Sequence, residues 1–72
     1  MTTTNKAASE LKVGQRIYIN RSQQWCPIVS TRYVSNSNCY MVMVNEGLYA
    51  SDGTPMMSPF VMDADLIVEV AA

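Results

Sequence analysis

Histidine is absent from this chain of 72 residues, and glycine occurs only three times. Without histidine, the chain lacks the commonest metal ligand and the usual general base of proteins, and it cannot form a Ser–His or Cys–His nucleophile pair. The three scattered glycines make no phosphate-binding loop. We therefore expect a protein that is not an enzyme and that uses neither a metal ion nor a cofactor.

Charged side chains and long apolar runs are also scarce. Charged residues make up 15% of the chain, against roughly 25% in typical soluble domains. Because apolar residues reach 49%, the composition excludes a disordered chain, which needs high charge and low apolarity. The longest apolar run, residues 40–44, is far too short to span a membrane. The N-terminal segment has no apolar stretch like that of a secretory signal, so we expect the protein in the cytoplasm.

Cysteine is limited to Cys26 and Cys39. Two thiols without histidine cannot complete a four-ligand zinc site unless carboxylates or a second chain contribute. We expect two reduced, partly buried thiols. A disulfide and a metal site shared between chains are the alternatives.

The first half of the chain contains a polar start followed by segments of β-forming residues. Residues 1–10 predict a flexible tail with at most one helical turn near residues 7–11. Strands are predicted over residues 15–20 and 28–34. In the first of them the isoleucines alternate with polar or amphipathic residues, so Ile17 and Ile19 should face the core.

The second half continues with short strands between turns. Residues 39–45 predict the strongest strand, apolar on both faces and so central or strongly bent. It forms a hairpin with the strand before it through a polar turn at 35–38. The remaining expectations are turns at 46–47 and 52–53, short strands over 48–51, 60–62 and 66–70, and one helical turn over 63–65. Asp63 and Asp65 fit an acidic cap of that turn better than a catalytic acid pair.

Five or six short strands with turns between them are typical of a small antiparallel barrel. An immunoglobulin sandwich needs about 100 residues, which is more than the chain provides. We therefore expect an all-β protein with a flexible tail over 1–10 and one small barrel domain over 11–72.

Three segments resemble the SH3-like small barrels. LKVGQRIYI resembles their opening strand, Trp25 with the following PIVSTRYVSNSNCYMVMV is similar to their long second and third strands, and MDADLIVEV resembles their last turn and strand. The resemblance covers residues 11–70 and implies an SH3-like barrel of five or six strands. Short barrels of this kind are common in bacteriophage genomes, which implies a phage accessory protein in the host cytoplasm. No functional residue carries over, because the loop 21–25 lacks the aromatic pair of peptide-binding SH3 domains.

Arginine and aromatic residues in the first half are the main candidates for a binding surface. Residues 1–36 contain all five basic residues and one acid, for a net charge of +4, whereas residues 37–72 contain five acids and no base. Aromatic rings beside arginine can stack on nucleic-acid bases, and both residue types anchor protein interfaces. The candidates are Arg16, Tyr18, Arg21, Trp25, Arg32 and Tyr33. Alternatively, Trp25 only caps one end of the barrel.

A second candidate surface is the segment with Met56, Met57 and Phe60. Methionine fills gaps in cores, and it is also frequent at adaptable binding surfaces. Together these features predict a protein-binding module whose partner is a host factor, a virion component or a second copy of the chain. The alternative is a small barrel that binds single-stranded nucleic acid, although a net charge of −1 argues against binding by phosphate neutralisation alone.

Overall fold

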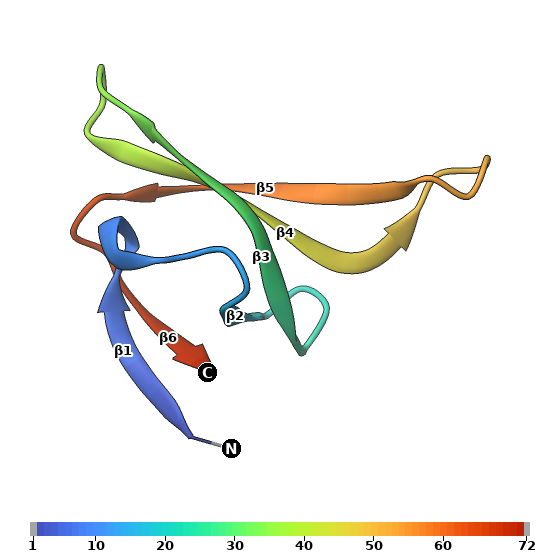
Figure 1. Ribbon diagram of the computed structural model, residues 1–72, viewed down its shortest axis with the longest axis horizontal. Coiled ribbons are helices and arrows are strands. Elements are labelled where there is room, and N and C mark those ends of the chain that lie inside the picture. The colour runs from blue at the N-terminus through green and yellow to red at the C-terminus, as the bar shows by residue number, and fades with distance from the viewer. Residues whose placement is uncertain (1, 72) are drawn as a thin grey trace.

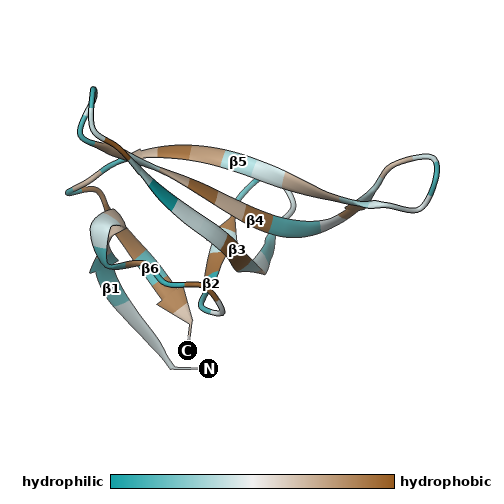
Figure 2. Ribbon diagram, turned by 45° about the horizontal axis from the view of Figure 1, so that its top comes forward, coloured by the Kyte–Doolittle hydropathy of each residue, from teal (hydrophilic) through white to brown (hydrophobic). Residues whose placement is uncertain are grey.

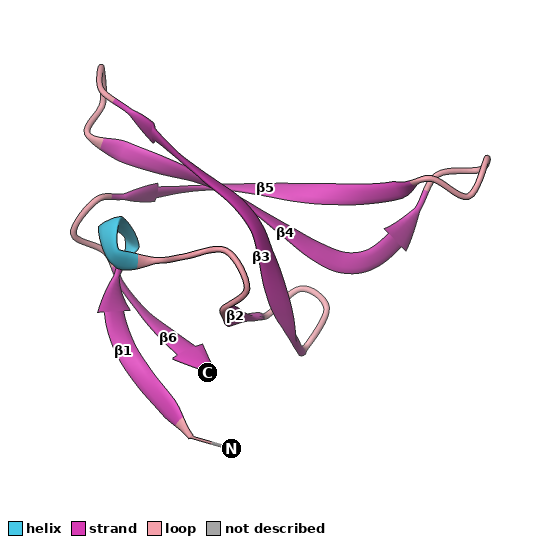
Figure 3. Ribbon diagram, viewed as in Figure 1, coloured by secondary structure: helices cyan, strands magenta, loops and turns pink. Residues whose placement is uncertain are grey.

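The computed structural model describes residues 2–71 and contains six strands and one short 3-10 helix (Figure 1). The elements are β1 (Thr3–Ala7), η1 (Ala8–Glu10), β2 (Arg16–Ile19), β3 (Gln24–Val34), β4 (Cys39–Tyr49), β5 (Pro55–Asp63) and β6 (Ile67–Ala71). They form one antiparallel sheet in the order β1-β6-β2-β3-β4-β5 (Figure 3). The predicted all-β class with five or six antiparallel strands is confirmed, and the number is six. Within residues 2–71, no helix is long and apolar enough to cross a membrane.

β3 joins the two halves of the sheet. Its first residues pair with β2, with Tyr18 opposite Trp25, and its later residues pair with β4. The register of the second pairing shifts between Ile28 and Ser30. Such a bulge bends a strand and increases its twist, so the sheet curls around the core instead of lying flat.

The predicted hairpin of β3 and β4 is confirmed, with its turn at residues 35–38. Asn38 adopts a left-handed backbone conformation with φ of 50°, which asparagine tolerates better than most residues. The turn at 52–53 is also present, because the Gly53 N–H donates to the Ala50 carbonyl at 2.9 Å. The turn predicted at 46–47 is wrong. β4 continues through these residues to Tyr49, and the register with β5 shifts between Asn45 and Leu48.

The core lies on the inner face of the curled sheet. Ile17 and Ile19 point into it as their alternation predicts, and they meet Val42 and Val44, which are fully buried on β4. Figure 2 shows the hydrophobic residues along β2 and β6 and in the middle of β4. The predicted strand over 39–45 is therefore central, between β3 and β5.

The flexible tail predicted for residues 1–10 is wrong over residues 2–10, and residue 1 lies outside the described residues. β1 pairs with β6 over five residue pairs, from Thr3 opposite Ala71 to Ala7 opposite Ile67. η1 follows at the place of the predicted helical turn and buries Ala8 in the core. The polar residues of β1 give no apolar pattern because β1 is an edge strand, and its conformation is set by pairing with β6 rather than by its own sequence.

The sheet does not close into a barrel, which corrects the predicted architecture. β1 and β5 are its two free edges, and the molecule measures 36 × 34 × 19 Å. β5 contains Pro55 and Pro59. Proline has no backbone N–H to donate to a second neighbour, so within sheets it is found on edge strands, at strand starts or at bulges, and two prolines in one strand fit an edge position. The curled sheet therefore remains open along β5.

Two isoleucines of opposite exposure test this description of the core. Ile17 is 1% exposed and Ile67 is 63% exposed. Ile17→Ala should lower the free energy of unfolding by about 2–5 kcal/mol, because it leaves a cavity. Ile67→Ala should change it by no more than about 0.5 kcal/mol, as usual for an exposed site. Urea unfolding at low protein concentration measures both, and equal losses would contradict the buried position of Ile17.

Candidate binding groove

A groove of about 430 Å³ lies on the open side of the curled sheet. Its lining comes from β2 with the turn after it, from β5, and from β6 with Leu66 before it. The volume falls within the roughly 300–1,000 Å³ of typical ligand sites, which are also mostly apolar. The groove thus has the size and the chemistry of a binding site.

The side chains that point inward from β2 and β5 form the apolar floor of the groove. Ile17 and Ile19 point inward from β2. On β5, Phe60 pairs with Val42 and Met62 pairs with Tyr40, and paired residues share a face of the sheet. Phe60 and Met62 therefore face inward and pack against the core while their outer parts line the groove.

The rim of the groove is also apolar and is exposed to solvent. Three of its residues, Leu66, Ile67 and Tyr18, have exposed side chains. The lining also includes two charged residues, Arg21 and Glu69. Glu69 accepts a hydrogen bond from the Thr3 hydroxyl at 2.8 Å, so it is held by β1. The rim therefore offers apolar surface between two fixed charges.

Arg21 reaches across the open side of the sheet from the turn between β2 and β3. Its guanidinium forms an ion pair with the Glu46 carboxylate of β4. Its Cζ also lies 5.5 Å from the centre of the Phe60 ring on β5, within the range of a cation–π interaction. Arg21 thus connects β4 and β5 to the turn after β2, and we call Arg21, Glu46 and Phe60 the clasp.

Glu46 is the buried member of the clasp. Its side chain is 2% exposed, whereas that of Arg21 is 65% exposed. Hydrogen bonds from Arg21, Ser58 and Ser22 hold the pKa of the Glu46 carboxyl at about 2, although burial opposes this shift. Each bond favours the charged carboxylate, so Glu46 stays ionised in the folded protein.

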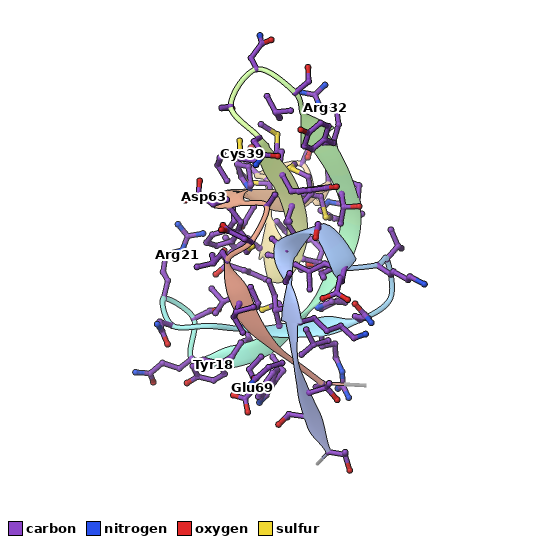
Figure 4. All side chains as sticks on the ribbon, turned by 90° about the vertical axis from the view of Figure 1, so that its left-hand side faces the viewer. Tyr18, Arg21, Arg32, Cys39, Asp63 and Glu69 are labelled. Atoms are coloured by element: carbon purple, nitrogen blue, oxygen red, sulfur yellow. The ribbon has the colours of Figure 1, made fainter. Side chains whose placement is uncertain are left out.

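The structure divides the predicted set of arginine and aromatic residues. Tyr18 and Trp25 lie side by side with their ring centres 5.6 Å apart, and Arg16 is on the same strand as Tyr18. Arg21 lies at the groove but pairs with Glu46. Figure 4 shows Arg32 at the opposite end of the molecule from Tyr18. Trp25 lies beside Tyr18, and roughly 23 Å of extended strand separates Trp25 from Arg32 along β3.

Tyr33 belongs to this distant end too. Its ring packs against Tyr40 with centres 5.2 Å apart, and its hydroxyl donates to Asn38 at 3.0 Å. The six predicted residues therefore do not form one surface. Trp25 is only half-buried, and its ring packs against Tyr18, which lines the groove.

The second predicted surface, with Met56, Met57 and Phe60, is divided as well. Phe60 belongs to the groove. Met56 is exposed on the hairpin of β4 and β5, and Met57 is half-buried beside it. Cys26 and Cys39 are free, buried thiols, so the structure contains no disulfide between them.

Sequence reasoning missed Glu46 as a site residue because it assigned residues 46–47 to a turn. A signal for its position was present in the sequence. Val42, Val44 and Glu46 follow one another at every second position, so a continued strand puts the carboxylate on the inner face. The pairing of Val44 with Ser58 then brings the Ser58 hydroxyl close to this carboxylate.

Comparisons with protein-family models, curated proteins and solved structures found no match for this chain. The SH3-like resemblance and the phage origin therefore stay predictions. The function has to be inferred from the groove and the residues around it.

Because Glu46 is held ionised in the clasp, we expect the folded protein to lose stability in acid. The pKa of Glu46 is lowered in the folded protein from 4.5 to about 2. A carboxyl whose pKa is lowered by folding stabilises the folded state. This contribution is complete above the pKa of the unfolded chain and disappears as the pH falls toward the pKa of the folded protein. Unfolding measured between pH 7 and pH 2 should show this loss for the wild type, and Glu46→Gln should lose less over the same window. Glu10→Gln, at an exposed site, serves as the control, and a Glu46→Gln profile parallel to the wild type would contradict the assignment.

Proposed function

We propose that this protein is a binding module whose groove accepts an extended apolar segment of another polypeptide. The groove itself is the observation that supports this proposal. Its floor is apolar and its rim carries the exposed side chains of Leu66, Ile67 and Tyr18. Large apolar side chains gathered at an open groove are typical of surfaces that bind proteins.

The edge position of β5 favours a polypeptide over a small ligand. β5 borders the groove and, within residues 2–71, pairs only with β4. An extended segment can add its backbone hydrogen bonds to such an edge while alternate side chains enter the pockets beside it. Pro59 withdraws one donor from this edge, so apolar side chains rather than a full ladder of hydrogen bonds would supply most of the affinity.

The charges around the groove agree with an uncharged occupant. Arg21 is paired with Glu46, and Glu69 is bonded to Thr3. Neither charge needs a partner from outside, and a second charge placed between them would lose hydration without gaining a dedicated counterion. Apolar residues are therefore the best match for the centre of the groove.

Binding of single-stranded nucleic acid is the alternative. The adjacent rings of Tyr18 and Trp25 favour it, because aromatic side chains can stack on bases. However, Arg21 is engaged by Glu46, and Arg32 lies at the far end of β3. Three basic residues remain, Lys6, Lys12 and Arg16, on a chain with a net charge of −1, so we place this function second.

Selection from a displayed library of random peptides tests the proposal. The wild-type chain should enrich peptides with apolar residues at alternating positions. Ile67→Ser should weaken their binding at least about tenfold, as expected for loss of an apolar anchor. Val61→Ser is the matched control, because Val61 is as exposed as Ile67 but does not line the groove.

Titration of the same protein with an oligonucleotide decides between the two functions. Peptide binding should depend little on salt, whereas binding to phosphates weakens steeply as salt is added. Quenching of Trp25 fluorescence by the oligonucleotide at low salt, with its loss at high salt and no enriched peptide, would overturn the proposal.

A further inference from the structure

The hairpin of β4 and β5 projects from the body of the molecule. Beyond the register shift of β4 it comprises residues 47–57, which we call the arm, and Figure 1 shows it extending away from the other strands. Leu48, Tyr49 and Met56 are 50%, 64% and 50% exposed along it. At least half of each of these side chains is therefore open to solvent.

The arm is apolar on both of its faces. Leu48 pairs with Met56, and Tyr49 pairs with Pro55. Adjacent pairs in a hairpin point to opposite faces, so each face carries one apolar pair. A hairpin that met solvent on one side would show polar residues on that face, and this arm does not.

Hydrogen bonds fix the shape of the arm at both ends. At its base, the Gly47 N–H donates to the Asn45 side chain at 2.9 Å. At its tip, the Thr54 N–H donates to the Asp52 side chain at 2.9 Å, and the Ala50 N–H donates to the Thr54 carbonyl at 2.8 Å. The arm is therefore a built element that presents its apolar side chains in a fixed arrangement.

Exposed apolar surface is concentrated on the arm and at the groove. Of the ten large hydrophobic residues that are exposed in residues 2–71, three lie on the arm and three on the groove rim. Neither surface can cover the other within one chain, because the arm leads away from the body of the molecule (Figure 1). Two such surfaces on one chain can cover each other between two copies.

We propose that the arm of one copy occupies the groove of a second copy, and that the exchange is reciprocal. This inference rests on the proposed function of the groove and names its partner. The arm contains a single charged residue, Asp52, at its tip. The flanks of the arm therefore bring no charge into the groove, and its one carboxylate stays at the tip.

The arrangement of the two surfaces suits a closed pair. Figure 1 shows the arm along the long axis of the molecule, whereas Figure 4, turned by 90°, shows Tyr18 and Arg21 pointing to one side of it. Two copies related by a two-fold axis can thus lay their grooves face to face, with each arm over the groove of its neighbour. A two-fold contact of this kind is self-complementary and closes without forming a filament.

The exchange has to bury a definite share of the surface of this small chain. A standard interface buries about 800 Å² on each partner, which is about one sixth of the 4764 Å² surface of this chain. In a reciprocal exchange, two identical contacts between an arm and a groove together bury this area. Small domains with few buried side chains often gain their missing burial by association.

Light scattering after size exclusion gives the first test. The wild type should have twice the 8.0 kDa mass of one chain at high concentration. The arm variant Leu48→Ser with Tyr49→Ser, and the groove variant Ile67→Ser, should each raise the dissociation constant at least about tenfold. Val61→Ser should remain dimeric, and circular dichroism of all variants checks that they fold.

A photo-crosslink then identifies the contact directly. Tyr49 is replaced by p-benzoylphenylalanine, and an isotope-labelled second copy marks crosslinks between chains. Crosslinks from position 49 to residues 60–69 of the second copy support the exchange, whereas crosslinks to the second arm overturn it.

The inference and the proposed function fail differently. A wild type that stays monomeric at high concentration overturns the exchange, and the displayed peptides then decide whether the groove binds another polypeptide. If no peptide binds and the wild type is still a dimer that depends on Leu48 but not on Ile67, the groove proposal fails and the exchange fails with it.

Discussion

The clasp between Arg21 and Glu46 is the interaction on which the shape of this molecule depends. The sheet curls but does not close, so no ladder of hydrogen bonds joins β5 to the strands across the open side. Arg21 supplies a connection there through one ion pair and one ring contact with Phe60. Because Glu46 is buried while Arg21 is largely exposed, the pair avoids the full desolvation cost of two buried charges. The bonds from Ser22 and Ser58 satisfy the rest of the carboxylate.

The same two inserted residues produce both the clasp and the arm. Residues 46 and 47 fall within the register shift of β4 against β5. Glu46 turns inward to meet Arg21, and Gly47 takes a positive φ of 80° that glycine adopts without strain. Such an irregularity bends its strand, so the chain leaves the body of the sheet immediately after it has placed the buried carboxylate. The clasp and the exposed hairpin therefore have one structural cause.

The sequence predicts those parts of the fold that local pattern determines. Alternation placed Ile17 in the core, and a polar turn between two apolar runs gave the central hairpin. β1 was not predictable, because its polar residues are ordered by pairing with β6, which lies 60 to 68 residues away in the sequence. The charge asymmetry of the two halves was visible, but only the fold brings Arg21 from the basic half to Glu46 in the acidic half. The groove was missed for a similar reason, since Ile67 looks like an ordinary strand residue until the sheet leaves it uncovered, and Phe60 was grouped with the methionines beside it in the sequence.

An open sheet explains why this chain combines few charges with a high apolar fraction. In a closed barrel of the same strands, Phe60 and Met62 would be covered by a neighbour of β5, and the apolar rim at Leu66 would have no purpose. The chain instead adds β1 on the far side of β6 and keeps β5 as an edge with Pro59. This arrangement leaves apolar surface at the groove and on the arm, which costs a small domain stability while it is monomeric. An occupant of the groove, as proposed above, would cover this surface and recover the lost stability.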